Sequence, residues 1–154
     1  MLDITLAKRR LKGTKDLTLV IVKGGKVIFE TGSHGIMAFV QVIEKFDKEL
    51  VNSTVADKIV GRAAALLCAY SKVASVFAVT ISEEGIKVLK ENKIPCQFET
   101  RVPNILNQEG VDVCPFEKLT ANSASPEEAY EALKSFKKFP ADVNANCQGP
   151  TIIS

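Results

Sequence analysis

The stretch from Leu17 to Thr31, LTLVIVKGGKVIFET, decides how the chain starts to fold. Two runs rich in β-branched residues, 17–23 and 26–31, have the length of strands, and Gly24-Gly25 stands between them. Glycine adopts positive φ at no steric cost, so a Gly-Gly pair between two such runs is the signal of a two-residue β-hairpin. The sequence therefore predicts an antiparallel hairpin here.

Beyond the hairpin the apolar pattern changes to a helical period. Residues 36–46 carry apolar side chains at three- and four-residue spacing, which predicts a helix after the Gly32–Gly35 loop. Thr54 and Asp57 have the T-x-x-D spacing of a capping box, which predicts a second helix from Val55 to about Ser71. Because its segment 63–70, AAALLCAY, lacks a polar face, we expect this helix to be covered on all sides.

The remaining elements follow from similar patterns. We expect a helix at 2–11, a strand at 74–81, a helix at 82–91 capped by Ser82, a strand at 95–101, an irregular stretch at 102–119 and a last helix at 125–138. A strand-helix-strand unit implies a parallel pair with a right-handed crossover. Joined to the hairpin, it predicts an α/β protein with a mixed sheet and helices on its faces.

Length and composition fit one ordinary globular domain. The chain has 154 residues, 46% hydrophobic and 25% charged, and we expect a single domain at 1–139 with a core at about 17–119 and a polar tail at 140–154. We expect no membrane span and no export signal, hence a cytoplasmic protein. The four cysteines form no C-x-x-C pair, so we expect free thiols.

Charge gives little support to nucleic-acid binding. The net charge is only +2, although five basic residues crowd the first predicted helix and the loop after it: Lys8, Arg9, Arg10, Lys12 and Lys15. Such a cluster could contact RNA or an acidic partner, but most charge runs form a solvated helix face. We therefore expect nucleic acid not to be a partner.

Four segments carry a resemblance to a known family: LVIVKGGKVIFE, VADKIVGRAAALL, VTISEEGIKVL and VCPFEKL, spanning roughly residues 17–119. They resemble a small prokaryotic family of domains of unknown function in the cytidine deaminase-like superfamily, and VADKIVGRAAA and VCPFEK are the distinctive pieces. The resemblance implies a cytidine deaminase-like, three-layer α/β/α fold with a mixed sheet.

The zinc motifs of that superfamily are the main departure. Deaminases begin one central helix with His- or Cys-Ala-Glu and the next with Pro-Cys-x-x-Cys; here we align the first place with Val55–Lys58 and the second with Thr80–Glu84. Val55 cannot bind zinc, and no cysteine lies near Ser82. Asp57 then stands where the proton-shuttling Glu would be. We expect no metal, no cofactor and no zinc-dependent deamination.

Six residues are candidates for a ligand site in the former deaminase cleft: Asp57, Lys58, Arg62, Ser82, Cys114 and Glu117. In the predicted helix, Lys58 and Arg62 lie one turn apart and would face a ligand, with Asp57 beside them or acting only as a helix cap. Gly61, inside that helix, would allow a close backbone approach. Ser82 begins the next helix.

Cys114 is the candidate nucleophile. It precedes a Pro-started helical turn whose open amides would lower a thiol pKa, with Glu117 or Asp57 to handle protons. The alternative for Cys114 is a buried structural cysteine. Gly32–Gly35 is a weaker candidate for an anion at a helix start, and His34 is more often a surface residue.

Three functional hypotheses follow. The leading one is a metal-free deaminase-like domain that binds a nucleoside- or nucleotide-like small molecule in the cleft. The second is an enzyme of another kind that uses Cys114 as nucleophile. The third is a protein-interaction module, such as a homo-oligomer built through the sheet edge or the tail.

Overall fold

The computed structural model describes residues 2–33, 35–107, 113–136 and 147–148. The hairpin prediction is confirmed. Strands β1 (Leu19–Lys23) and β2 (Lys26–Thr31) pair antiparallel, and the turn residues Gly24 and Gly25 have φ of 59° and 79°. Positive φ at both turn positions is what the type I′ form of a two-residue hairpin turn requires, which explains the glycine pair.

A five-stranded mixed sheet forms the centre of the molecule, in the order β2-β1-β3-β4-β5. The other strands are β3 (Thr54–Val60), β4 (Ser75–Ser82) and β5 (Cys96–Val102). β1 pairs antiparallel with β3, whereas β3, β4 and β5 run parallel to one another. The predicted α/β class with a mixed sheet is confirmed, but the parallel part is a β-α-β-α-β unit and not the single strand-helix-strand unit that we expected, because β3 is an additional strand.

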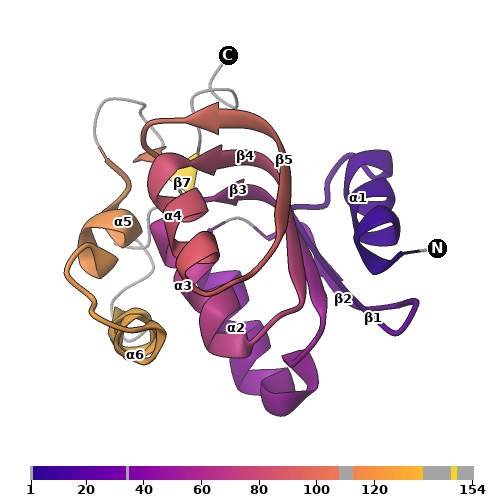
Figure 1. Cartoon of the computed structure of the whole chain (residues 1–154), viewed down its shortest axis with the longest axis horizontal. Coiled ribbons are helices and arrows are strands. Elements are labelled where there is room, and N and C mark those ends of the chain that lie inside the picture. The colour runs from indigo at the N-terminus through magenta and orange to yellow at the C-terminus, as the bar shows by residue number, and fades with distance from the viewer. Residues whose placement is uncertain (1, 34, 108–112, 137–146, 149–154) are drawn as a thin grey trace.

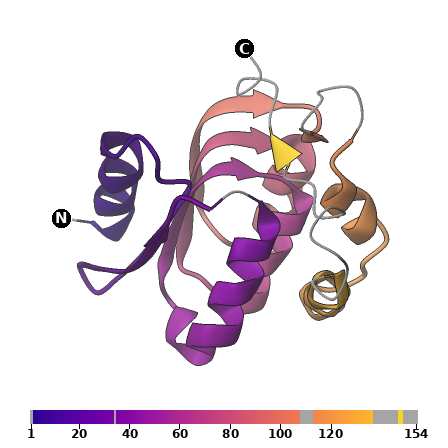
Figure 2. The same cartoon turned by 180° about the vertical axis from the view of Figure 1, so that it is seen from behind.

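Helices cover both faces of this sheet. Helix α1 (Asp3–Gly13) lies on one face, and α2 (Ile36–Phe46), α3 (Arg62–Ser71) and α4 (Glu83–Glu91) cover the other (Figures 1 and 2). The short helix α5 (Pro115–Thr120) and the longer α6 (Pro126–Phe136) lie outside α3. A 3₁₀ turn, Asp47–Leu50, follows α2. The larger apolar core lies between the sheet and α2–α4, and a smaller one lies under α1.

The predicted helix from Val55 to Ser71 is wrong in its first part. Residues Thr54–Val60 form the central strand β3, paired on both sides, and the helix begins only at Arg62 after Gly61. The Thr54 hydroxyl, expected to cap a helix, is 2.9 Å from the Ser75 hydroxyl of the neighbouring strand. The T-x-x-D spacing at the start of β3 is the same as that of a helix cap, and the segment lacks the regular alternation that would have identified a strand.

The structure also corrects the region after β5. We expected an irregular stretch at 102–119, but it contains the short strand β6 (Leu106–Asn107) and helix α5. Within the predicted tail, β7 (Cys147–Gln148) pairs antiparallel with β6. Residues 137–146 and 149–154 lie outside the described residues.

The basic residues of α1 pack against the sheet. Arg10 forms a two-pronged ion pair with Glu30 at 2.7 Å, Lys12 pairs with Glu99, and the Lys8 ammonium lies 5.3 Å from the centroid of the Phe77 ring.

In the described part of the chain, no helix is both long and apolar enough to cross a membrane.

Candidate functional site

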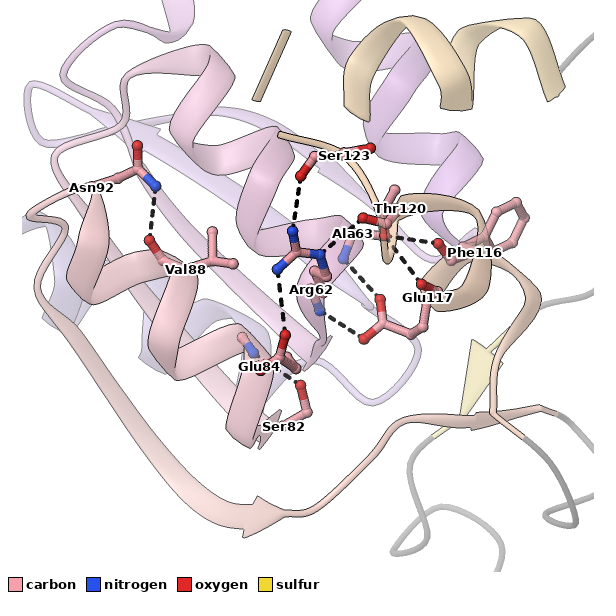
Figure 3. A network of polar contacts seen from close by, with 11 residues as sticks. Arg62, Ala63, Ser82, Glu84, Val88, Asn92, Phe116, Glu117, Thr120 and Ser123 are labelled. Atoms are coloured by element: carbon pink, nitrogen blue, oxygen red, sulfur yellow. Dashed lines mark hydrogen bonds and ion pairs between the residues drawn. The ribbon is translucent and has the colours of Figure 1, made fainter. Parts of the chain in front are cut away.

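The start of helix α3 is built around the carboxylate of Glu117. Gly61, the residue before the helix, has no side chain to cap it. Glu117, arriving from α5, accepts hydrogen bonds from the backbone N–H groups of Arg62 at 2.7 Å and Ala63 at 2.8 Å (Figure 3). A carboxylate satisfies open amides and the positive end of the helix dipole. Glu117 is therefore a cap supplied from another helix.

The side chain of Arg62 completes this attachment. Its Nε donates to the carbonyl oxygen of Thr120 at 2.9 Å, and its Nη2 donates to that of Ser123 at 3.0 Å. Its Nη1 lies 3.4 Å from Glu84 Oε1 in a longer ion pair. The backbone and the side chain of Arg62 thus both hold the α5 segment against α3.

Burial raises the pKa of Glu117. Desolvation is the larger effect, and it is opposed by the hydrogen bonds from Ala63 and Arg62 and by the nearby Arg62 charge, all of which lower the pKa. The hydrogen bonds that hold the Glu117 carboxylate in place therefore offset only part of the loss of its hydration.

A cavity of about 170 Å³ lies between the sheet, α2, the start of α3 and α5. Its apolar wall comes from strands, helices and the segment before α5: Leu19, Ile36, Phe39, Ile59, Ile105 and Phe116. Its polar lining includes Thr18, Ser33, Asp57 and Glu117. A mostly apolar cavity with a few convergent polar groups is the usual form of a small-molecule site.

Asp57 is the central acid of this cavity. It sits in the middle of β3, with its side chain half-buried. Its Oδ1 accepts a hydrogen bond from the backbone N–H of Ile59 at 3.2 Å, and no side chain of the described residues donates to it. Desolvation raises the pKa of Asp57 to about 7, against the lowering effect of the backbone N–H groups of Ile59 and Lys58. The Asp57 carboxyl therefore changes charge near neutral pH.

A second cavity, of about 160 Å³, adjoins the first. It lies where β4 and β5 end, and it is lined by residues that include Arg62, Ser82, Glu84 and Asn104. Glu117 and Ile105 line both cavities, so these two side chains stand between them. Ser82 itself caps α4, with its hydroxyl accepting from the Gly85 N–H at 3.0 Å, as predicted.

The structure divides the six predicted site residues between the two cavities. Asp57, Lys58, Cys114 and Glu117 line the first, and Arg62, Ser82 and again Glu117 line the second. Adjacent strand residues point to opposite faces, so Lys58 does not join Asp57. Instead, Lys58 Nζ lies 3.3 Å from the carbonyl oxygen of Lys15, in the loop after α1. The predicted helical stripe of Lys58 and Arg62 is thus wrong.

The alignment of Val55–Lys58 with a deaminase helix start is also wrong, because these residues form β3. Asp57 therefore does not occupy a helix start. In the described part of the chain, no group of three or more His, Cys, Asp and Glu side chains gathers as a metal site would require.

The cysteines differ from our expectation. Cys68 and Cys96 are free thiols, but Cys114 is disulfide-bonded and buried. Burial raises the pKa of both free thiols, so neither is activated. A disulfide sulfur is not a thiolate nucleophile, so Cys114 does not have the reactive form that the second hypothesis needs.

Sequence reasoning missed the residues that close the cavity on the side of the hairpin. The Thr18 hydroxyl lies 2.6 Å from the Ser33 carbonyl oxygen and 3.1 Å from that of Thr31, which holds the loop after β2 at the cavity. The Gly32–Gly35 loop is the weaker candidate of the sequence analysis, and its residues Ser33 and Gly35 line the cavity. His34 lies outside the described residues.

Comparisons with known proteins place the chain beside one family. A family model, TM1506, described as "Domain of unknown function (DUF1893)", matches residues 7–137. The crystal structure of a DUF1893 family protein from Thermotoga maritima is similar, with 31% sequence identity and a TM-score of 0.79, over 87% of this chain and 89% of that one. No curated protein sequence matches the chain.

Two structures of RibD from Acinetobacter baumannii show a weaker likeness. Form 2 has 23% identity and a TM-score of 0.44, and form 1 has 22% and 0.46. Each match covers 63% of this chain, which spans about a third (33%) of the RibD chain.

Proposed function

This chain belongs to the DUF1893 family of domains of unknown function, and we propose that it is a small-molecule-binding domain whose ligand enters the cavity beside Asp57. The ligand class we propose is nucleoside- or nucleotide-like. That class comes from the resemblance of the segments VADKIVGRAAALL and VCPFEKL to the deaminase-like superfamily. These two segments contribute Asp57, Gly61, Cys114, Phe116 and Glu117 to the cavity lining.

One observation carries the proposal. Asp57 presents a carboxyl group to a cavity with apolar walls, and no side chain of the described residues donates a hydrogen bond to it. Desolvating a carboxylate without a partner is unfavourable, and burial accordingly raises the pKa of Asp57. A structural role would be served at lower cost by an apolar residue, so the Asp57 carboxyl is best explained by a ligand that completes its hydrogen bonds.

Cys114 is disulfide-bonded and so lacks the thiolate that a nucleophile in this position would need. An oligomer built through the sheet edge stays a prediction. The edges of the five-stranded sheet are β2 and β5.

The test is ligand binding by the wild-type chain and by two variants at the cavity. Saturation-transfer NMR with a panel of nucleosides and nucleotides would find a ligand, and calorimetry would give its affinity. We expect Asp57→Ala to weaken binding by at least about tenfold, since it removes a hydrogen-bonded or charged contact. Ala38→Leu, a partly exposed cavity-lining position on α2, should weaken it by narrowing the space.

Asp16→Asn is the matched control, because Asp16 is exposed and is not among the cavity-lining residues. It should bind as the wild type does. If Asp57→Ala and Ala38→Leu both bind a ligand with unchanged affinity, the ligand does not use this cavity and the proposal is wrong.

A further inference from the structure

The charges around Asp57 are unbalanced within the cavity. The Lys58 ammonium turns toward Lys15 on the other face of the sheet, and the Glu117 carboxylate is engaged by the amides that begin α3. Among the described cavity-lining residues, no cationic side chain reaches the Asp57 carboxyl. The cavity therefore holds an acid whose counter-charge the described residues do not supply.

The size of the cavity limits what can supply that charge. An apolar protein cavity of about 150 Å³ accommodates one benzene ring, and this cavity measures about 170 Å³. Two of its wall residues, Phe39 and Phe116, are aromatic, and both are almost completely buried. The cavity thus has room for the equivalent of one six-membered ring with a small substituent, in apolar surroundings.

We propose that the group entering this cavity is a cationic nitrogen group, an amidinium or a primary ammonium, carried on an apolar body the size of one six-membered ring and paired with Asp57. This inference rests on the proposed ligand-binding function and specifies the part of the ligand that the cavity takes. An amidinium presents two parallel N–H donors to the two carboxylate oxygens, which is the strongest common arrangement for a carboxylate.

The same geometry rejects an anion. A carboxylate or phosphate placed beside Asp57 would add a second negative charge in apolar surroundings, with Glu117 nearby as another acid. A neutral amide of the same shape gives hydrogen bonds without the charge attraction, so it binds more weakly than the cation. The phosphate of a nucleotide would accordingly stay outside the cavity.

Binding of a cation depends on the ionisation of Asp57. The titratable groups on the cavity side of Asp57 are Glu117 on α5 and Cys68 on α3, whereas the neighbouring Lys58 ammonium points to the other face of the sheet. The Cys68 thiol has a pKa raised by burial and by the Asp57 charge. The Asp57 pKa of about 7 means that the carboxylate form disappears as pH falls. Affinity for a cation should therefore rise by about 100-fold between pH 5 and 8, and level off above.

The experiment uses three probes of one shape: benzamidine (cation), benzamide (neutral) and benzoate (anion). Chemical shift perturbation in ¹H–¹⁵N spectra of the wild-type chain gives the three affinities. We expect benzamidine to bind at least about tenfold more tightly than benzamide, and benzoate not to bind. Equal affinities for benzamidine and benzamide, or preference for benzoate, would overturn the inference without any variant.

Two variants sharpen the result. Asp57→Asn keeps the shape and removes the charge, and it should lose the benzamidine preference and its pH dependence together. His34→Gln is the control for pH dependence, since His34 is the single histidine of the chain and follows the cavity-lining Ser33 in sequence. A pH profile that moves with His34→Gln and not with Asp57→Asn contradicts the assignment to Asp57.

Failure of this inference is distinguishable from failure of the proposed function. If the nucleoside and nucleotide panel binds in the cavity but benzamidine has no advantage over benzamide, the cation assignment is wrong and the binding function stands. If neither the panel nor the three probes shift any cavity resonance, both are wrong.

Discussion

The Glu117 carboxylate occupies the space that a side chain on Gly61 would fill. A Cβ atom placed on Gly61 would lie 2.6 Å from Glu117 Cδ and 2.8 Å from Ile105 Cγ1, distances that real Cβ contacts do not show. The backbone of Gly61, with φ −104° and ψ −163°, is in a region open to any residue. Glycine is therefore required here by the close approach of α5 and not by the backbone angles.

Gly61→Ala tests that relationship. The added methyl must push aside Glu117 and Ile105, which weakens the cap on α3, so we expect the free energy of unfolding to fall by about 1–3 kcal/mol. Urea denaturation measures it. Gly13→Ala is the matched control, because nothing lies within 4 Å of a Cβ at the end of α1 and its φ is not positive. Equal effects of the two substitutions would show that contact with Glu117 is unimportant.

Arg62 should matter more to stability than an exposed arginine does. Arg62→Met removes the hydrogen bonds to the Thr120 and Ser123 carbonyl oxygens, with an expected loss of about 1.5–3 kcal/mol. Arg101→Met removes only the exposed pair with Glu83, with side chains 55% and 48% exposed, and should cost at most about 0.5 kcal/mol. Thermal unfolding compares the two.

Hydrogen exchange separates a local effect from a global one. In Arg62→Met, the amides of residues 116–120 should exchange faster than in wild type while those of β3 keep their wild-type rates, because the side chain that held α5 is gone. Uniform acceleration of exchange over both elements would contradict the assigned role of Arg62 in holding α5.

The sequence predicted the hairpin and the helix at 36–46 because their signals are local. It failed at 55–60, where the deciding interaction is not local. Strand β3 is defined by pairing with β1 and β4 on its two sides, and its sequence has no regular alternation to distinguish it from a helix. The prediction of a helix at these residues placed the side chains of Asp57 and Lys58 together. In the strand, these two adjacent side chains point to opposite faces of the sheet.

The site was predictable in its residue types but not in its arrangement. Asp57, Cys114 and Glu117 were recognised as candidates, and they do line one cavity. The hydrogen bond from Arg62 to Glu117 joins residues 55 apart in sequence, and no periodicity or motif spacing encodes such a contact. The disulfide at Cys114 was missed for the same reason, since the cysteine spacing showed no recognisable pair.

Alkylation tests the state of Cys114. Iodoacetamide added to the unfolded chain without reductant should label Cys68 and Cys96 and leave Cys114 unmodified; after reduction, Cys114 should be labelled as well. Peptide mapping by mass spectrometry reads the outcome. Labelling of Cys114 before reduction would show a free thiol and would reopen the nucleophile hypothesis.

Removing that disulfide should destabilise the fold. Cys114→Ser abolishes the crosslink, and we expect a loss of about 2–4 kcal/mol in the free energy of unfolding under oxidising conditions. In the presence of reductant, wild type and variant should differ far less. Cys96→Ser is the matched control, because Cys96 is a free thiol and only partly buried.

Asp57 should make the folded state less stable as pH rises. Its pKa is about 7 in the folded chain and 3.8 ordinarily, so between these values the folded state binds more protons than the unfolded state. The contribution of Asp57 to the free energy of unfolding must then fall with rising pH across this window, by up to about 1.4 kcal/mol per pH unit, and stay constant above pH 7. The substitution Asp57→Asn removes this pH-dependent contribution to the free energy of unfolding. It should match wild type near pH 4 and exceed it by about 2–4 kcal/mol at pH 8.

Urea unfolding of both proteins from pH 4 to 8 measures the difference directly, and titrations of other groups cancel in the comparison. Asp16→Asn, at an exposed position, should follow wild type throughout. Parallel curves for wild type and Asp57→Asn would show that Asp57 is not desolvated in the folded chain. A variant that is more stable but binds benzamidine less well would show that the Asp57 carboxyl is retained for binding at the expense of stability.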